Sequence, residues 1–169
     1  MNWAYVHLLI NHVPVILAPL GFAVAILALI TRRRAVWLYA LASLTLAGIS
    51  AYPVMATGDE ASHIVRRAIP NVNRDAIEEH EEAGDTAMWI LLASGVVAAY
   101  AWWRLGRRID ERLPTWLVGL VLLTGAASTV GVTIASLKGG DIIHKEAHIA
   151  PSSLPPAAIR APGGAPQGD

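Results

Sequence analysis

Long apolar runs alternate with short polar stretches along this chain. A membrane-spanning helix takes about 20 predominantly apolar residues, and four runs have about this length, at residues 3–30, 35–56, 86–103 and 115–137. The connections between the first two runs and between the last two are short. The pattern predicts an all-α protein, a four-transmembrane-helix up-down bundle that forms one membrane domain over residues 1–149.

The connection over residues 58–85 is the one sizeable loop, and we expect it to be helical and to lie outside the membrane. Thr57-Gly58-Asp59-Glu60 has the form of a capping box, which predicts a short helix opening here and ending near Ala68, before Pro70. Asp75 with Glu78 is a second such signature. It predicts a helix that continues without a break into the third span.

The C-terminal part of the chain changes in composition. The glycine pair Gly139–Gly140 is expected to end the fourth helix, and residues 141–149 to follow it as a short helix or turn. Residues 150–169 are rich in proline and glycine. They predict a disordered-type tail without a core of its own.

Composition also favours a membrane protein. The 169 residues are 54% hydrophobic and 15% charged, and the mean hydropathy is +0.47, which is more apolar than soluble domains usually are. The formal net charge is zero, so no nucleic acid partner is expected. The chain has no cysteine, which excludes disulfides, thiolate zinc sites, cysteine-held iron–sulfur clusters and covalently attached c-type haem.

Arginines predict the orientation. The two short connections hold Arg32, Arg33, Arg34, Arg104, Arg107, Arg108 and Arg112. Because cytoplasmic loops carry the excess of positive residues, we expect both turns inside and both termini outside a bacterial cytoplasmic (inner) membrane. The first span lacks a basic flank and a cleavage site, so it is expected to be retained.

Aromatic side chains are expected at both lipid–water interfaces. The outer group is Trp3, Tyr5, Tyr52 and Trp89, and the inner group is Trp37, Tyr39, Tyr100, Trp102, Trp103 and Trp116. The spans contain no Asp, Glu, Lys or Arg, and a proton pump or ion-coupled transporter usually has an ionisable residue at mid-membrane. Transport is therefore disfavoured.

All six histidines fall on the predicted outer side, at His7, His12, His63, His80, His144 and His148. A single histidine there is more often solvated than a metal ligand. With a rise of about 1.5 Å per residue, three of them are expected in one layer above the outer leaflet: His7, His80 and His144. His7 and His12 diverge by about 140° around one helix, so they suit two sites rather than one.

Two further patterns bear on ligand binding. His144 and His148 are four residues apart, a spacing that suits one helix face and one metal ion. Five carboxylates surround His80 in residues 78–85. Glu79 and Glu82 are expected to be solvated. Glu78, Glu81 and Asp85 share a helix face that could bind a metal or pair with the basic residues Arg66, Arg67 and Arg74.

The chain resembles a bacterial four-helix integral-membrane family without an assigned function, which is sometimes fused to Rieske iron–sulfur domains. "HLLINHVPVIL" at residues 7–17 resembles the family's opening H-x4-H-x-P helix, "HEEAGDTA" at 80–87 its histidine before the third span, and "GGDIIHKEAHI" at 139–149 its closing segment. Glu146 stands where the family's last histidine is expected, which leaves His144 and His148 as alternatives. The resemblance implies a membrane redox protein with b-type haem.

The first functional hypothesis is therefore a redox subunit that binds b-type haem (haem b) and transfers electrons within a larger complex, rather than a stand-alone enzyme. Haem b needs axial ligands, commonly two imidazoles from facing helices. His12 and His80 are the preferred pair, and His7 with His144 or His148 is a possible second pair. Arg66, Arg67 and Arg74 are candidates for neutralising the propionates.

Two alternatives remain open. One is a non-haem iron, zinc or copper site built from His7, His80, His144 or His148 together with Glu81 or Asp85. The other is a cofactor-free accessory subunit of a respiratory or photosynthetic complex. In every case the lipid bilayer is one partner, and other membrane or periplasmic redox subunits are the expected protein partners.

Overall fold

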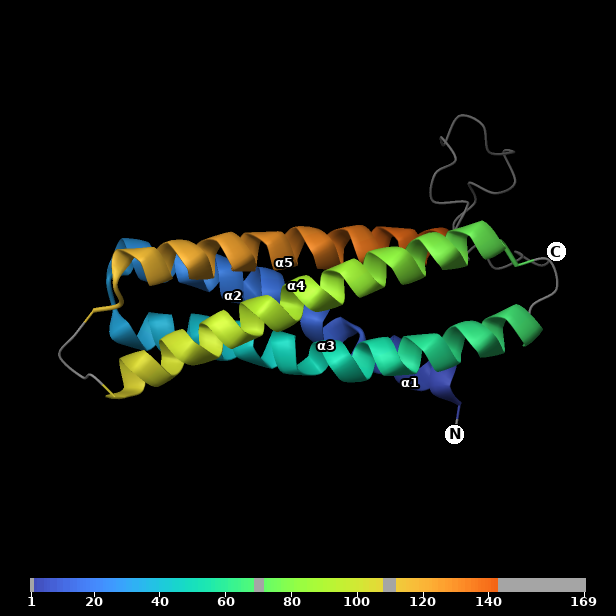
Figure 1. Cartoon of the computed structure of the whole chain (residues 1–169), viewed down its shortest axis with the longest axis horizontal. Coiled ribbons are helices and arrows are strands. Elements are labelled where there is room, and N and C mark those ends of the chain that lie inside the picture. The colour runs from blue at the N-terminus through green and yellow to red at the C-terminus, as the bar shows by residue number, and fades with distance from the viewer. Residues whose placement is uncertain (1, 69–71, 108–111, 143–169) are drawn as a thin grey trace, which may run out of the picture.

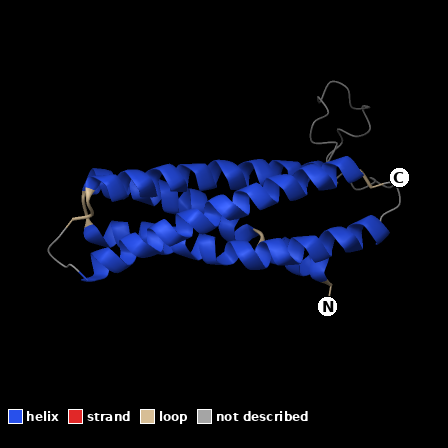
Figure 2. Cartoon of the chain, viewed as in Figure 1, coloured by secondary structure: helices blue, strands red, loops and turns tan. Residues whose placement is uncertain are grey.

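The computed structural model describes residues 2–68, 72–107 and 112–142. All of its regular elements are helices: α1 (Trp3–Ile10), α2 (His12–Thr31), α3 (Arg34–Ala68), α4 (Arg74–Arg107) and α5 (Thr115–Asp141). Figure 1 shows long helices lying side by side in a bundle, and Figure 2 shows only helices and loops in the described part of the chain. The all-α prediction is confirmed.

The bundle consists of four rods that are long and apolar enough to cross a membrane. Helices α1 and α2 together form the first rod, Trp3–Thr31, and α3, α4 and α5 form the others. Asn11 separates α1 from α2 but keeps helical angles, φ −62° and ψ −24°. Pro14 lies one turn further on and has no N–H to give to the carbonyl of residue 10, which weakens the helix at this point.

Helix α3 extends well beyond the predicted end of the second span. The expectation that Thr57-Gly58-Asp59-Glu60 starts a new helix is wrong, because α3 continues through these residues to Ala68. Thr57 is buried, and its hydroxyl donates to the carbonyl of Pro53 in its own helix at 2.8 Å. Packing against the neighbouring rods therefore keeps the helix intact where the local sequence alone favours a start.

Of the other predicted helix boundaries, one is confirmed and one is wrong. Helix α4 runs from Arg74 to Arg107 without a break, as predicted from Asp75. Helix α5 ends at Asp141, so the expectation that Gly139–Gly140 terminates it is wrong. Both glycines are inside the last turn. The predictions for residues 143–169, which include His144, His148 and the tail, lie outside the described residues.

The core consists of two clusters of buried residues, and both combine alanines with larger apolar side chains. The larger side chains of the first cluster include Trp37, Leu41, Leu105 and Leu117. The second cluster contains Ala18, Ala47, Ala51, Met88, Leu91 and Val132. Trp37 is only 8% exposed and therefore faces the bundle core rather than lipid, whereas the other aromatic residues of its group are exposed.

Helices α3 and α4 make their closest approach through two glycines. A Cβ atom added to Gly48 would lie 2.6 Å from the Cα of Gly95, and one added to Gly95 would lie 2.9 Å from the Cα of Gly48. No side chain fits between the two backbones, so a glycine is required on each helix. This contact is typical of helix packing in membranes, and α4 crosses α3 at an angle in Figure 1.

The bundle has an arginine end and a histidine end. The arginine end holds the α2–α3 turn and the end of α4, where Arg34 Nη2 donates to the carbonyl of Leu105 at 2.6 Å. The histidine end holds the start of α1, the C-terminal part of α3, the start of α4 and the end of α5. Both ends follow from the antiparallel course of the rods, which Figure 1 shows.

Candidate functional site

His7 lies on the inward face of the first rod. His7, Asn11, Pro14 and Ala18 follow one another at steps of four, three and four residues, and such steps keep residues on one helix face. Pro14 and Ala18 are buried in the bundle. His7 therefore continues the buried face of α2 into α1, where its side chain is half-buried.

His80 occupies the equivalent place on α4. Ala87, Ser94 and Ala101 follow it at steps of seven residues, and all three are buried. A step of seven residues is close to two helical turns, so His80 shares their inward face. Its ring is half-buried at the histidine end.

The Nδ1 atom of His7 is held by α3. It lies 3.1 Å from the carbonyl oxygen of Val54 and 3.3 Å from Oγ1 of Thr57. A carbonyl oxygen only accepts hydrogen bonds, so Nδ1 carries the proton and donates it. The Thr57 hydroxyl directs its own proton to a carbonyl of α3, which leaves its oxygen as a second acceptor for His7.

The Nδ1 atom of His80 is held in the same way by α5. It lies 2.9 Å from the carbonyl oxygen of Ala135, and it must again be the donor. When Nδ1 of a neutral imidazole carries the proton, Nε2 has the free lone pair. Each of the two rings therefore has its Nε2 atom available as a ligand.

Two glycines make these hydrogen bonds possible. A Cβ atom added to Gly58 would lie 3.1 Å from Cε1 of His7, and one added to Gly139 would lie 3.0 Å from Cε1 of His80. Both distances are tighter than ordinary contacts. Each imidazole thus packs against a helix surface that has no side chain at that position.

The same local construction occurs twice. Val54 precedes Gly58 by four residues, and Ala135 precedes Gly139 by four residues. In an α-helix the carbonyl of residue i accepts from the N–H of residue i+4, so residue i+4 stands beside that carbonyl. A glycine there lets the ring reach the carbonyl from outside the helix.

The two rings lie close together and nearly perpendicular. Their centroids are 6.5 Å apart, and the ring planes make an angle of 76°. A metal–imidazole bond is about 2.0–2.1 Å long, and a ring nitrogen lies about 1.1 Å from its ring centre, so two imidazoles on opposite sides of one metal have centres about 6.3 Å apart. The 6.5 Å between the His7 and His80 centroids is close to this value, and the two rings meet in a T-shaped, edge contact.

The predicted pair of His12 and His80 is not the pair that the structure brings together. His12 is exposed, and its Nδ1 atom is bound to the carbonyl of Leu8 in its own rod at 2.8 Å. The predicted divergence of His7 and His12 is confirmed, since one faces inward and the other outward. His63 is also exposed.

Two ion pairs are formed at the histidine end. Arg66 Nη2 donates to Glu81 at 2.9 Å, so Glu81 has the ion pair that was one of the two roles left open for its helix face. Lys138 Nζ donates to Glu79 at 2.6 Å, so Glu79 has a partner on α5 that was not expected. Arg67 is exposed. Within residues 2–68, 72–107 and 112–142, no group of three or more His, Asp or Glu side chains could hold a metal ion.

Sequence reasoning missed the residues that hold the two rings: Val54, Thr57, Gly58, Ala135 and Gly139. A signal for them was present. Gly58 follows the buried residues Leu44 and Ala51 at steps of seven, and Gly139 follows the buried residues Ser128 and Val132 along one face of α5. Extending these faces past the apolar runs would have placed both glycines opposite the histidines.

No protein-family model matches this chain, and comparisons with curated proteins and with solved structures find no similar one. The resemblance to the four-helix family associated with Rieske domains stays a prediction.

Proposed function

We propose that this protein is a redox subunit of a bacterial cytoplasmic membrane that binds one b-type haem between His7 and His80. The observation that carries the proposal is the ring pair itself: two imidazoles from different rods, each fixed through Nδ1, with centroids 6.5 Å apart. Bis-imidazole ligation between facing helices is a common arrangement for this cofactor.

The number of ligands favours haem over a non-haem ion. Haem contributes four pyrrole nitrogens of its own, so two imidazoles complete its coordination. A non-haem zinc site takes at least three side chains, and the described part of the chain offers no group of three His, Asp or Glu residues. Two imidazoles therefore suffice for haem, whereas a zinc site would need at least one further ligand from outside the part of the chain that the structure describes.

The chain's own residues would orient and tune this site. The carbonyls of Val54 and Ala135 accept from Nδ1 of the two rings, which fixes the tautomer and makes Nε2 a stronger donor. Haem, when bound, supplies one-electron transfer. Exposed arginines at the same end, Arg67 and Arg74, are proposed to neutralise the propionates, whereas Arg66 pairs with Glu81.

We also propose an orientation of the protein across the membrane. With the arginine end in the cytoplasm, both termini and the His7–His80 pair lie at the outer face. An electron donor or acceptor would then approach the histidine end from the periplasmic side. We propose electron transfer as the activity, because one-electron transfer is the chemistry that a haem held by two imidazoles would supply.

The test is the visible spectrum of the full chain purified in mild detergent after expression with a haem precursor. The expected result is a Soret band and a sharp α band after reduction. Because the ring planes are 76° apart, the oxidised protein should give a highly anisotropic low-spin electron paramagnetic resonance signal, rather than the rhombic signal of parallel imidazoles.

Matched variants separate the site from incidental binding. His7→Ala and His80→Ala are expected to lose the low-spin spectrum, while His12→Ala and His63→Ala retain it, since those two rings are exposed. Absence of any haem spectrum in the wild-type protein overturns the proposal. In that case, elemental analysis distinguishes a non-haem metal protein from a cofactor-free accessory subunit.

A further inference from the structure

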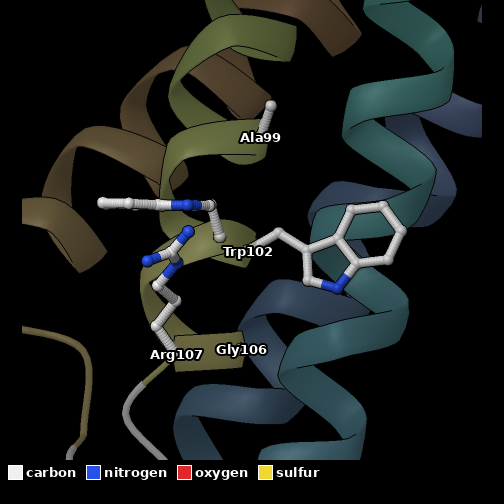
Figure 3. Close-up of a pocket in the computed structure, with 5 residues that line it drawn as sticks. Ala99, Trp102, Gly106 and Arg107 are labelled. Carbon is white, nitrogen blue, oxygen red and sulfur yellow. The ribbon is translucent and has the colours of Figure 1, made fainter.

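A shallow groove, largely open to the surroundings, lies on the surface of α4 at the arginine end, far along the rod from the histidine pair. It is lined by Ala99, Trp102, Trp103, Gly106 and Arg107, and Figure 3 shows the labelled ones following one another along a single helix. Two small residues form its floor, two indoles flank it, and one guanidinium stands at its end. The haem proposal does not involve this surface.

The floor of the groove is open along the helix axis. A Cβ atom added to Gly106 meets nothing within 4 Å, so no described residue fills the space above it. Ala99 and Gly106 are about 10 Å apart along the axis at 1.5 Å per residue. Because α4 is a membrane-spanning candidate, the groove runs in the direction in which acyl chains lie.

The end of the groove is positively charged. The Arg107 guanidinium lies 5.2 Å from the centroid of the Trp103 ring, a cation–π contact that holds it beside the groove. The charged side chains described at this end are arginines, namely Arg32, Arg33, Arg34, Arg104, Arg107 and Arg112, and with Arg108 they outnumber Asp110 and Glu111 of the same connection in the sequence. A guanidinium binds phosphate oxygens through two parallel N–H groups, so this end suits a phosphate.

We propose that the groove binds one anionic phospholipid, with an acyl chain over Ala99 and Gly106 and the phosphate at Arg107. Indole rings favour the lipid–water interface, and Trp102 and Trp103 are 42% and 55% exposed. A second copy of this chain is the less suitable occupant. Packing two copies through this face would bring Arg104 and Arg107 of both chains together, and like charges across an interface oppose association.

The test is native mass spectrometry of the delipidated full chain in detergent, titrated with phosphatidylglycerol or with phosphatidylcholine of the same acyl chains. The wild-type protein is expected to retain one phosphatidylglycerol in preference to phosphatidylcholine. Arg107→Gln should lower the retention of phosphatidylglycerol about tenfold, because the direct hydrogen bonds between guanidinium and phosphate are lost. Arg33→Gln removes the same charge from the same end outside the groove and should change little.

A second pair of variants tests the floor. Gly106→Leu fills the groove and should remove the bound lipid, while Gly119→Leu is the control, because a Cβ atom at Gly119 also meets nothing within 4 Å. The proposal is overturned if Arg107→Gln and Arg33→Gln weaken binding equally, since the attraction is then general. It is also overturned if Gly106→Leu leaves the bound lipid in place or converts a dimer to monomers, which would make the groove an interface between copies.

Discussion

The inward helix faces carry different kinds of side chain at the two ends of this bundle. At the arginine end these faces carry Trp37, Leu41, Leu105 and Leu117, and the charged groups lie at the helix termini. At the histidine end they carry His7 and His80, each bound to a backbone carbonyl of a neighbouring helix. Apolar packing is enough for a membrane-spanning bundle, so the inward faces at the histidine end carry polar groups that spanning alone does not require.

The glycines show the same contrast. Gly48 and Gly95 let two backbones touch where α3 crosses α4, which is a packing role. Gly58 and Gly139 instead face imidazole rings. Glycines near the middle of the bundle therefore allow close packing of helices, whereas glycines at the histidine end make room for the imidazole rings.

The largest effect is expected from making the histidine end resemble the arginine end. His7→Leu combined with His80→Leu replaces both ligands with apolar side chains that suit a bundle core. We expect complete loss of the haem absorbance with retention of the helical circular dichroism, because the four rods are held by their apolar faces. A double variant that still shows the low-spin spectrum contradicts the assignment of the ligands.

At the arginine end, a substitution in the core should affect stability and not haem binding. Trp37→Ala removes a large buried side chain and should destabilise the protein by about 3–5 kcal/mol, seen as a lower midpoint of thermal unfolding in detergent, with the haem spectrum unchanged. Tyr39→Ala is the control, since Tyr39 is 71% exposed. Equal losses in the two variants would mean that Trp37 does not contribute to the core as described.

The glycines that face the rings should give a smaller, specific effect. Gly58→Ala and Gly139→Ala each place a Cβ atom about 3 Å from an imidazole carbon and should lower haem affinity about 10–100-fold, as loss of ligand support does. Gly84→Ala on α4 has no atom within 4 Å and should leave affinity unchanged. Haem titration of the apoprotein measures all three, and unchanged affinity in both site variants would show that the rings are not held by this packing.

The Thr57 hydroxyl beside His7 should change the properties of the haem site without being required for haem binding. Thr57→Val removes one of two acceptors for Nδ1 and keeps the carbonyl of Val54, so haem is retained with a less than about tenfold change in affinity and a higher midpoint potential. Thr45→Val is the control, because Thr45 bonds only to Leu41 in its own helix. A potential that moves equally in both variants would exclude a role for the hydroxyl.

The smallest effect is expected from breaking an exposed ion pair at the histidine end. Lys138→Gln breaks the pair with Glu79, whose side chain is 62% exposed, and should change stability by less than about 0.5 kcal/mol. Thermal unfolding at low and high salt measures it. A loss of several kcal/mol would show that this exposed pair joins α4 to α5 more strongly than exposed ion pairs usually do.

The lengths of the apolar runs were enough to predict the rods but not their ends. The second and fourth rods continue past the predicted boundaries, through Thr57–Glu60 and Gly139–Gly140. Capping residues and glycines end a helix only when no neighbour stabilises the next turn. Here the next turns pack against His7 and His80, and this contact between distant segments overrides the local preference.

The candidate site was predicted in part. His7 and His80 were both placed at one end of the bundle, and the angular separation of His7 and His12 was correct. His12 was expected to pair with His80, but the ring that contacts His80 is that of His7, because height along the rod was considered without the direction in which each side chain points. The supporting carbonyls of Val54 and Ala135 have no signature in the amino-acid sequence, since every residue carries the same carbonyl.

By itself the sequence determined the number of rods, the end at which histidines gather and the angle between side chains on one helix, because these depend on hydropathy and on helical periodicity. Tertiary structure decided which imidazoles meet and which carbonyls hold them. The physical reason is that two rings meet only when their helices have the correct register and separation. Register and separation are set by close contacts between rods, such as Gly58 against His7 and Gly139 against His80.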